Sequence, residues 1–400
     1  MTAPLRIALV KPDWGIRGGG EIAVDRVVEL LEAAGHRVQR HQIYIPALPR
    51  APFGLHVPDR VWESAPEYFR YLSTLEAVEQ LDVSGAELVI STQPPSWGVQ
   101  HRRHLSIFFH HLRVFYDLSQ PYLDAGFVAD PDLHLAAQAR LREVEQARIE
   151  RVSWFCPISE TVQQRLVDFN GVKNSSVLHF GVGVGEERPE GATAEPGHGD
   201  VLCVSRSEFP KRTELFIHAL KFRPQDKGVL VGTGGRLAWV QAVDRKLSGR
   251  RRADLEAVAA EVLWLNKGEA KAKPSHHRTN VTFAGRVSDA ELLALYRSAP
   301  CVVAPAYDED YGLTALEAMS HGRPVVACRD GGGLTSFVRD GVNGFLVEPD
   351  GRSIAEAVGR IVDDPELARK LGEGALETAA SHTWARCAGE LKDAIERVMG

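Results

Sequence analysis

The stretch that decides the fold class is CVVAP at residues 301–305, followed by EDYGLTALE at residues 309–317. The first part is a short apolar run, which is typical of a strand buried on both faces. The second passes through Gly312 into good helix formers, so we expect a helix to begin near that glycine. A buried strand followed directly by a helix is the repeating unit of a parallel α/β sheet.

The same alternation recurs on both sides of this stretch. Before it, the sequence predicts helices at 24–34, 133–152 and 214–220 and strands at 5–10, 88–91, 106–110, 154–159, 201–205, 228–231 and 281–284. After it, strands are expected at 324–328 and 345–347 and a last helix at 385–399. Residues 181–199 are rich in Gly, Glu, Pro and Ala, which indicates a linker.

This pattern predicts two doubly wound, Rossmann-like α/β domains that face a central cleft, where ligands bind at the carboxyl ends of the strands. The first domain is expected at residues 1–184, completed by a returning helix at 385–400, and the second at residues 185–384.

The composition narrows the class of protein. The chain has 400 residues, of which 44% are apolar, and a net charge of −6, which argues against a nucleic-acid partner. The five cysteines are scattered without a CxxC pair, so buried free thiols are expected. No signal peptide and no apolar run of about 18 residues is found, and we expect a soluble, cytoplasmic protein.

The helix start near Gly312 is the first candidate for ligand binding. The N–H groups of Leu313 and Thr314 lack a helical partner and lie at the positive end of the helix dipole, so they suit a phosphate. Glu309, before the helix, suits sugar hydroxyls, and Glu317, about one turn inside it, suits the hydroxyls of a ribose. The alternative is that both glutamates are ordinary surface charges.

Two cations follow the strand at 201–205. Arg206 ends that strand and Lys211 lies in the next loop, so together they suit a diphosphate. The alternative is a solvated basic loop.

Two further sequence features are candidates in the first half. Gly19 and Gly20 lie in the first strand-to-helix loop, where glycine permits a phosphate or an acceptor to approach, or simply gives a flexible turn. His110 is expected at a strand end facing the ligand, although His111 is an equal candidate and a lone histidine is more often structural.

In this order, the motifs resemble the retaining glycosyltransferases of family 4, the group 1 glycosyl transferases with the two-domain GT-B fold. The most specific match is Glu-x-(Phe or Tyr)-Gly-Leu-Thr-x-x-Glu at residues 309–317. The supporting matches are GGGE at 18–21, His110, Ser159, Arg206 with Lys211, FAGRV at 283–287, GRPVVA at 322–327, Gly331 with Gly332, and GVNG at 341–344.

The resemblance implies a role for each matched position. It implies catalytic roles for His110, Arg206, Lys211 and Glu309. It implies donor-binding roles for Gly19, Gly20, Arg286, Val287, Tyr311, Gly312, Leu313, Thr314 and Glu317. Two departures are evident: Arg212 replaces the glycine that usually follows the lysine, so a looser loop is expected, and the insertion at 236–280 is long. The basic residues of this insertion form either a lid or a solvated loop: Lys267, Lys271, Lys273, His276 and His277.

The implied function is retaining transfer of a hexose from a UDP- or GDP-linked sugar to a small acceptor. No carboxylate nucleophile is evident, so we expect a front-side displacement that needs neither a metal nor a cofactor. The alternatives are a sugar-nucleotide epimerase and a non-catalytic sugar-nucleotide-binding protein. A nicotinamide oxidoreductase is disfavoured because the glycines do not complete GxGxxG.

Few features of the sequence indicate the acceptor. The candidate membrane-surface helix at 59–77 is acidic as well as aromatic, so it does not indicate an anionic lipid. Residues 101–124 are either acceptor-facing or a packed strand-and-loop unit.

Overall fold

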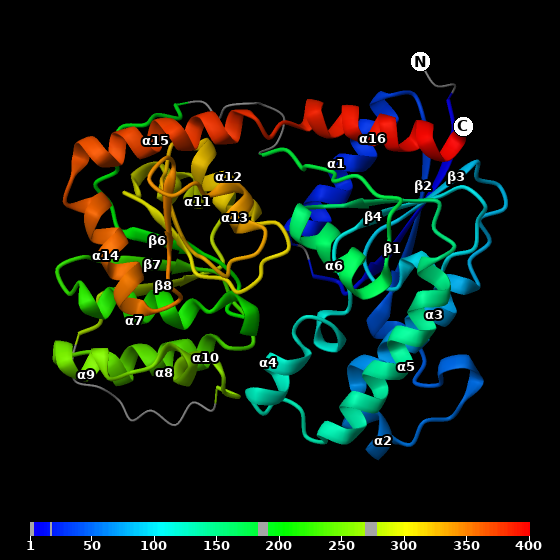
Figure 1. Ribbon diagram of the computed structural model, residues 1–400, viewed down its shortest axis with the longest axis horizontal. Coiled ribbons are helices and arrows are strands. Elements are labelled where there is room, and N and C mark those ends of the chain that lie inside the picture. Colours follow the sequence, from blue (N-terminus) through cyan, green and yellow to red (C-terminus); the bar gives the residue numbers. More distant parts are fainter. Residues whose placement is uncertain (1–3, 17, 183–190, 269–277) are drawn as a thin grey trace. The chain divides into compact units, whose positions relative to one another are not determined.

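The computed structural model describes residues 4–16, 18–182, 191–268 and 278–400, which form two compact units (Figure 1). The first unit contains Met1–Gly181 and Trp384–Gly400, and the second contains Val182–Thr383. The boundary expected between residues 184 and 185 lies outside the described residues, as do Lys271, Lys273, His276 and His277.

The first unit is built on a five-stranded parallel sheet in the order β2-β1-β3-β4-β5. Its strands are β1 Arg6–Asp13, β2 Arg37–Tyr44, β3 Leu88–Ser91, β4 His104–Phe108 and β5 Trp154–Pro157. Its helices are α1 Gly19–Ala33, α2 Asp59–Ser64, α3 Pro66–Glu79, α4 Ser119–Asp124, α5 Pro131–Ile149, α6 Glu160–Asn170 and α16 Trp384–Met399. Short 3-10 turns lie at Ile45–Ala47, Pro52–Gly54, Ser96–Gly98 and Arg113–Phe115.

The second unit is built on a six-stranded parallel sheet in the order β11-β10-β9-β6-β7-β8. Its strands are β6 Val201–Val204, β7 Gly228–Val231, β8 Val281–Gly285, β9 Val302–Ala304, β10 Val325–Cys328 and β11 Gly344–Val347. Its helices are α7 Thr213–Phe222, α8 Leu237–Leu247, α9 Arg252–Glu256, α10 Ala260–Trp264, α11 Asp289–Ser298, α12 Leu313–Ser320, α13 Leu334–Phe337, α14 Gly351–Val362 and α15 Pro365–Ala380, with a 3-10 turn at Phe209–Lys211.

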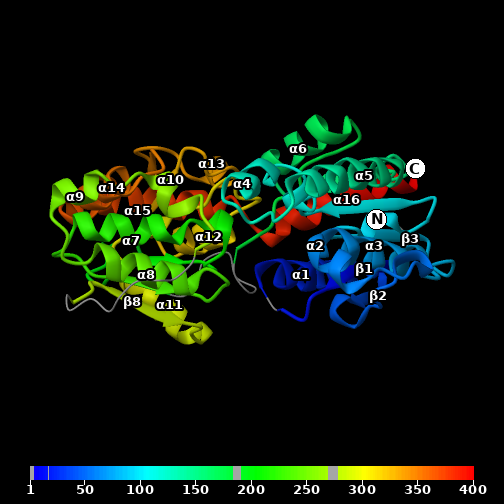
Figure 2. The ribbon, with the colours of Figure 1, turned by 90° about the horizontal axis from the view of Figure 1, so that it is seen from below.

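Helix packing buries the apolar strands of the second sheet. The helix α7 lies between α8 and α14 (Figure 2), and α12 packs against α15. The buried side chains of these helices join those of the strands in one core, in which Phe216, Leu230 and Phe345 are almost fully enclosed. This packing fixes the carboxyl ends of the strands, where the candidate residues lie.

Two features of the first unit differ from what the sequence predicts. β2 was not predicted, because Val38 and Ile43 are separated by four polar or charged residues and most of the strand is exposed. The helix expected at 59–77 is two helices, which meet at Ala65 and Pro66; the proline ring cannot continue the preceding helix. The free, buried state expected for the five cysteines is confirmed.

Candidate functional site

The topological switch point of the second sheet lies between β6 and β9. The chain runs from β6 outward to β7 and β8 and then returns to the other side of β6 as β9. At such a point the loops after the two strands part, and open α/β sheets bind ligands there. Arg206 and Lys211 follow β6, and Glu309 follows β9.

Lys211 and Glu309 meet directly at this place. The ammonium group of Lys211 donates to Oε2 of Glu309 in an ion pair that is only partly exposed. The backbone of Glu309 is held as well: its N–H donates to the Gly331 carbonyl at 3.1 Å, and its own carbonyl accepts from the Gly333 N–H at 2.7 Å. The ion pair with Lys211 holds the carboxylate of Glu309, and the two backbone hydrogen bonds hold its main chain.

The helix α12 begins just beyond Glu309, as the sequence predicts. Gly312 has φ +107°, and a Cβ there would lie 2.6 Å from Cδ2 of Leu334, so only glycine fits this turn. Tyr311 is buried edge-to-face against Phe337, at 5.0 Å between ring centroids. Leu313 and Thr314 form the first turn, whose N–H groups have no intrahelical acceptor.

Glu317 lies one turn further along α12 and is half-buried. Burial raises the pKa of its carboxyl group to about 6, although the hydrogen bond from the Tyr296 hydroxyl, at 3.1 Å, opposes this shift. The ring of Tyr296 stacks on His321 and its hydroxyl also approaches the Thr314 carbonyl at 3.4 Å. The Tyr296 hydroxyl thus lies between the carboxylate of Glu317 and the first turn of α12.

The other predicted residues of this unit are less tightly gathered. Arg206 is exposed, and within the described ranges no carboxylate pairs with it. Arg286 and Val287 follow β8, which is separated from β6 by β7, and Arg286 is exposed. The structure therefore brings Lys211 and Glu309 into contact but places Arg286 two strands away.

Arg212 is the residue of this loop whose role the sequence did not reveal. It takes up the left-handed conformation itself, at φ +46°, and is 2% exposed. Its guanidinium donates to both carboxylate oxygens of Asp330, at 2.8 and 2.5 Å, and to the carbonyls of Pro305 and Ala306, at 2.8 and 3.2 Å. The looser loop expected from the lost glycine is therefore wrong, because the arginine side chain anchors the loop.

Aromatic rings surround the same guanidinium. It lies over the rings of Trp264 and Tyr307, 5.2 and 5.5 Å from their centroids. The indole N–H of Trp264 donates to the Phe209 carbonyl at 2.8 Å, so the end of the helical insertion is tied to the loop after β6. In the sequence, the one sign of this anchoring role was an arginine at position 212, where the resembled family usually has glycine, together with the aromatic residues that it contacts.

In the first unit, Gly19 and Gly20 are the first two residues of α1, so the helix starts earlier than predicted and includes these two glycines, which were expected in the preceding loop. The carboxylate of Glu21 accepts from the Gly18 N–H at 2.9 Å and lies 3.6 Å from the ammonium group of the buried Lys11. A Cβ on Gly20 would make only ordinary contacts, the shortest at 3.6 Å, so packing alone does not require glycine there.

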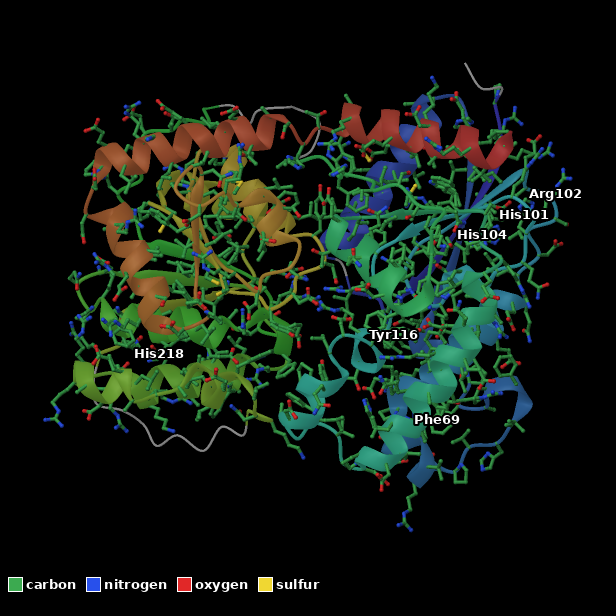
Figure 3. The ribbon with its side chains drawn as sticks, in the orientation of Figure 1. Phe69, His101, Arg102, His104, Tyr116 and His218 are labelled. Carbon is green, nitrogen blue, oxygen red and sulfur yellow. The ribbon has the colours of Figure 1, made fainter. Side chains whose placement is uncertain are left out.

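His110 and His111 differ clearly in environment. His111 is fully buried, stacks on Tyr116 (labelled in Figure 3) at 4.1 Å and has Nε2 2.7 Å from Oδ1 of Asn170; burial lowers its pKa to about 4. His110 is half-buried, lies two residues beyond β4, and has Nδ1 2.6 Å from the His111 carbonyl. His111 has the contacts of a structural residue, which leaves His110 as the candidate for ligand contact.

The described residues also bear on a metal site and on membrane insertion. No group of three or more His, Cys, Asp or Glu side chains is arranged to hold a metal ion within them. None of the described helices is long and apolar enough to cross a membrane.

Part of the sequence matches a known family. The profile described as Glycosyl transferases group 1 matches residues 186–378. A D-inositol 3-phosphate glycosyltransferase 2 from Catenulispora acidiphila is 34% identical over 190 residues, which cover 44% of each chain. A D-inositol 3-phosphate glycosyltransferase from Streptomyces griseus is 42% identical over 116 residues, 28% of this chain and 24% of that one. The chain thus matches less than half the length of these relatives.

Solved structures resemble the whole chain. Sucrose-phosphate synthase from Thermosynechococcus elongatus aligns with a TM-score of 0.63 and 22% identity, covering 97% of both chains. Anabaena Alr3699/HepE, solved with UDP and glucose, aligns with a TM-score of 0.59 and 17% identity, covering 98% of this chain and 99% of that one. At this level of identity the likeness establishes the fold.

Proposed function

Since the second domain belongs to the group 1 glycosyltransferases and the chain has the GT-B fold, we propose that this protein is a retaining hexosyltransferase. It moves the sugar of a UDP- or GDP-linked donor to a small-molecule acceptor. The observation that carries the proposal is the contact between Lys211 and Glu309 at the topological switch point, beside the start of α12.

The charges around this contact suit the parts of such a donor. Arg206, Lys211 and the N–H groups that begin α12 offer positive charge to the diphosphate. The carboxylate of Glu309 accepts from hydroxyls of the sugar, and that of Glu317 accepts from the ribose. Because the pKa of Glu317 is about 6, this group is ionised, and a good acceptor, at neutral pH.

The proposed reaction is a front-side displacement. The bond between the anomeric carbon and the phosphate oxygen breaks, and the acceptor oxygen bonds to that carbon on the same face. The acceptor's proton passes to the departing phosphate oxygen. Arg206 and Lys211 stabilise the charge that develops on the diphosphate. Glu309 does not serve as the nucleophile in this scheme, since its carboxylate is assigned to the hydroxyls of the sugar and not to the anomeric carbon.

Binding and transfer assays test this proposal. UDP or GDP should raise the melting temperature more than ADP or NAD does. With the donor so identified, a screen of acceptors should yield a product that keeps the anomeric configuration of the donor. Conversion of the donor without acceptor would indicate an epimerase, and donor binding without any product would indicate a sensor. Transfer that is lost in EDTA and restored by Mg²⁺ or Mn²⁺ would contradict the proposed charge stabilisation.

A further inference from the structure

A pocket of about 260 Å³ lies within the first unit, and none of the residues assigned above lines it. Its wall includes Trp14, the turn at 45–48, Trp62 and Arg70. Trp14 follows the last residue of β1 and Ile45 the last residue of β2, while α2 and α3 supply Trp62 and Arg70. The pocket therefore opens beyond the carboxyl ends of two adjacent strands, where open α/β sheets bind ligands.

Two indoles with contrasting exposure line the pocket beside the apolar side chains of Ile45, Pro46 and Leu48. Trp62 is 3% exposed and stacks on Phe69 of α3 at 5.7 Å (Phe69 is labelled in Figure 3), and its buried N–H has no acceptor among the described residues. Trp14 is 52% exposed. Tyr44, which precedes the turn in the wall, is also 53% exposed. A largely exposed indole beside an enclosed one offers a flat face to a ligand ring.

The two arginines of the wall differ in their charge partners. Arg50 lies over the Trp62 ring at 5.3 Å, and its Nη1 is 3.2 Å from Glu63 and 3.7 Å from Asp59. Arg70 lies near the Trp14 ring, 6.0 Å from its centroid, and no carboxylate pairs with it in the part of the chain that the structure describes. The pocket thus has an uncompensated guanidinium beside its exposed aromatic face.

We propose that this pocket binds a small anion that carries a ring, namely a phosphate or carboxylate on a compact ring system. The ring packs on the indole of Trp14, and the anion accepts from the planar fork of Arg70, a geometry that suits both oxyanions. The volume is below the roughly 300–1,000 Å³ of pockets for drug-sized ligands, so one or two rings fill it. That the anion is the acceptor rests on the proposed function; its binding does not.

Indole resonances of the full-length protein test the binding directly. The seven tryptophans give separate ¹H–¹⁵N signals, and Trp14→Phe and Trp62→Phe identify the two of interest. Phenyl phosphate should shift both signals in a saturable way, with an affinity at least ~10-fold higher than that of phenol or of inorganic phosphate. Arg70→Ala should lower the phenyl phosphate affinity by ~10-fold or more, whereas Arg60→Ala, which removes an exposed cation of α2 outside the pocket, should not.

Each other outcome overturns the proposal. Equal binding of phenol would show that no anion is recognised, and equal binding of inorganic phosphate would show that no ring is. The absence of saturable shifts would exclude this ligand class. Arg70→Lys, which keeps the charge but not the fork, should recover only part of the affinity and shows whether the Arg70→Ala effect is local. Failure of phenyl phosphate to bind leaves donor binding and transfer unaffected, so the two proposals fail separately.

Discussion

Arg206 and Lys211 follow the same strand but have different surroundings. Lys211 already pairs with Glu309, whereas Arg206 is exposed and has no carboxylate partner among the described residues. Lys211 therefore holds the Glu309 carboxylate in place before any donor binds. Arg206 keeps its hydrogen-bond donors available for an incoming diphosphate.

Replacing Arg206 by alanine should lower turnover at saturating donor by ~10²–10³-fold, the effect of removing one preorganised charge stabiliser. Single-turnover transfer rates measure this. Arg250→Ala removes an exposed arginine of the same unit and serves as the control. Near-normal turnover in Arg206→Ala would remove this residue from the proposed mechanism.

Glu317 should make donor binding depend on pH. Burial raises the pKa of its carboxyl group to about 6, so it is ionised above that pH and protonated below it. A protonated carboxyl group is a poorer acceptor, and donor affinity should fall by about 5- to 10-fold from pH 7 to pH 5. Calorimetry with an intact nucleotide sugar measures this, because its diphosphate does not titrate near pH 6. Glu317→Gln should bind more weakly and flatten the profile; an unchanged slope would contradict the role.

At the scale of the elements, Arg212 joins three loops that come from different strands. It belongs to the loop after β6, donates to the carbonyls after β9, and pairs with Asp330 after β10. These three strands are neighbours in the order β10-β9-β6. The arginine thus fixes the segment that leads to Glu309 relative to the one that carries Lys211.

Arg212→Gly should destabilise the protein by about 2 kcal/mol. Glycine relieves the left-handed backbone, worth roughly 1 kcal/mol, but it leaves the partly exposed Asp330 unpaired and frees two carbonyls, which costs more. Urea unfolding measures the loss. The donor KM should also rise, because the Glu309 segment loses its anchor. A more stable glycine variant with an unchanged KM would show that the side chain does not position the loop.

The sequence predicted the apolar strands well, but it did not predict the exposed strand β2 or the buried helix α14. β3 and β7 lie at the residues expected, since continuous apolar runs such as LVIS and GVLV are most stable when they are buried inside a sheet. β2 was not predicted because no continuous apolar run marks this edge strand, which is stabilised by pairing with β1 along its whole length.

The candidate site shows the same limit. Lys211 and Glu309 were each predicted from local motifs, but their contact depends on β9 returning beside β6. Arg212 was missed because a position that usually needs glycine gives no reason to expect an anchoring side chain. Candidate residues can therefore be predicted from local sequence motifs, whereas contacts between residues on different strands depend on the topology of the sheet.

At the scale of the whole molecule, the chain returns to the first unit through its last helix. The buried side chains of α16 include Cys387, Leu391 and Ile395, and the helix packs against β4 and β5. His179 binds this helix to the rest of the unit. Its ring Nδ1 lies 2.9 Å from the Glu390 carboxylate of α16, and its backbone N–H donates to the same carboxylate at 2.7 Å. A helix distant in sequence thereby completes the first unit.

This attachment should weaken at alkaline pH. Burial lowers the pKa of His179, but hydrogen bonds to Glu160 and Glu390 outweigh it and raise the pKa to about 9. The stabilisation is thus complete below the unfolded pKa of about 6.5 and is lost as the pH rises toward 9. Thermal unfolding between pH 6.5 and 9 should show a falling melting temperature for the first unit. His179→Gln should lower the melting temperature at pH 6.5 and reduce this slope, and an unaltered slope would refute the role.

The reactivity of the buried thiols can report how often each unit opens locally. Cys156 and Cys387 belong to the first unit, and Cys203, Cys301 and Cys328 to the second. Burial raises the pKa of Cys156 and Cys203 to about 12, so neither thiol reacts while its surroundings stay closed. The rate at which an alkylating reagent modifies each thiol therefore reports how often its unit opens, and mass spectrometry of the labelled peptides resolves the two units without any added probe.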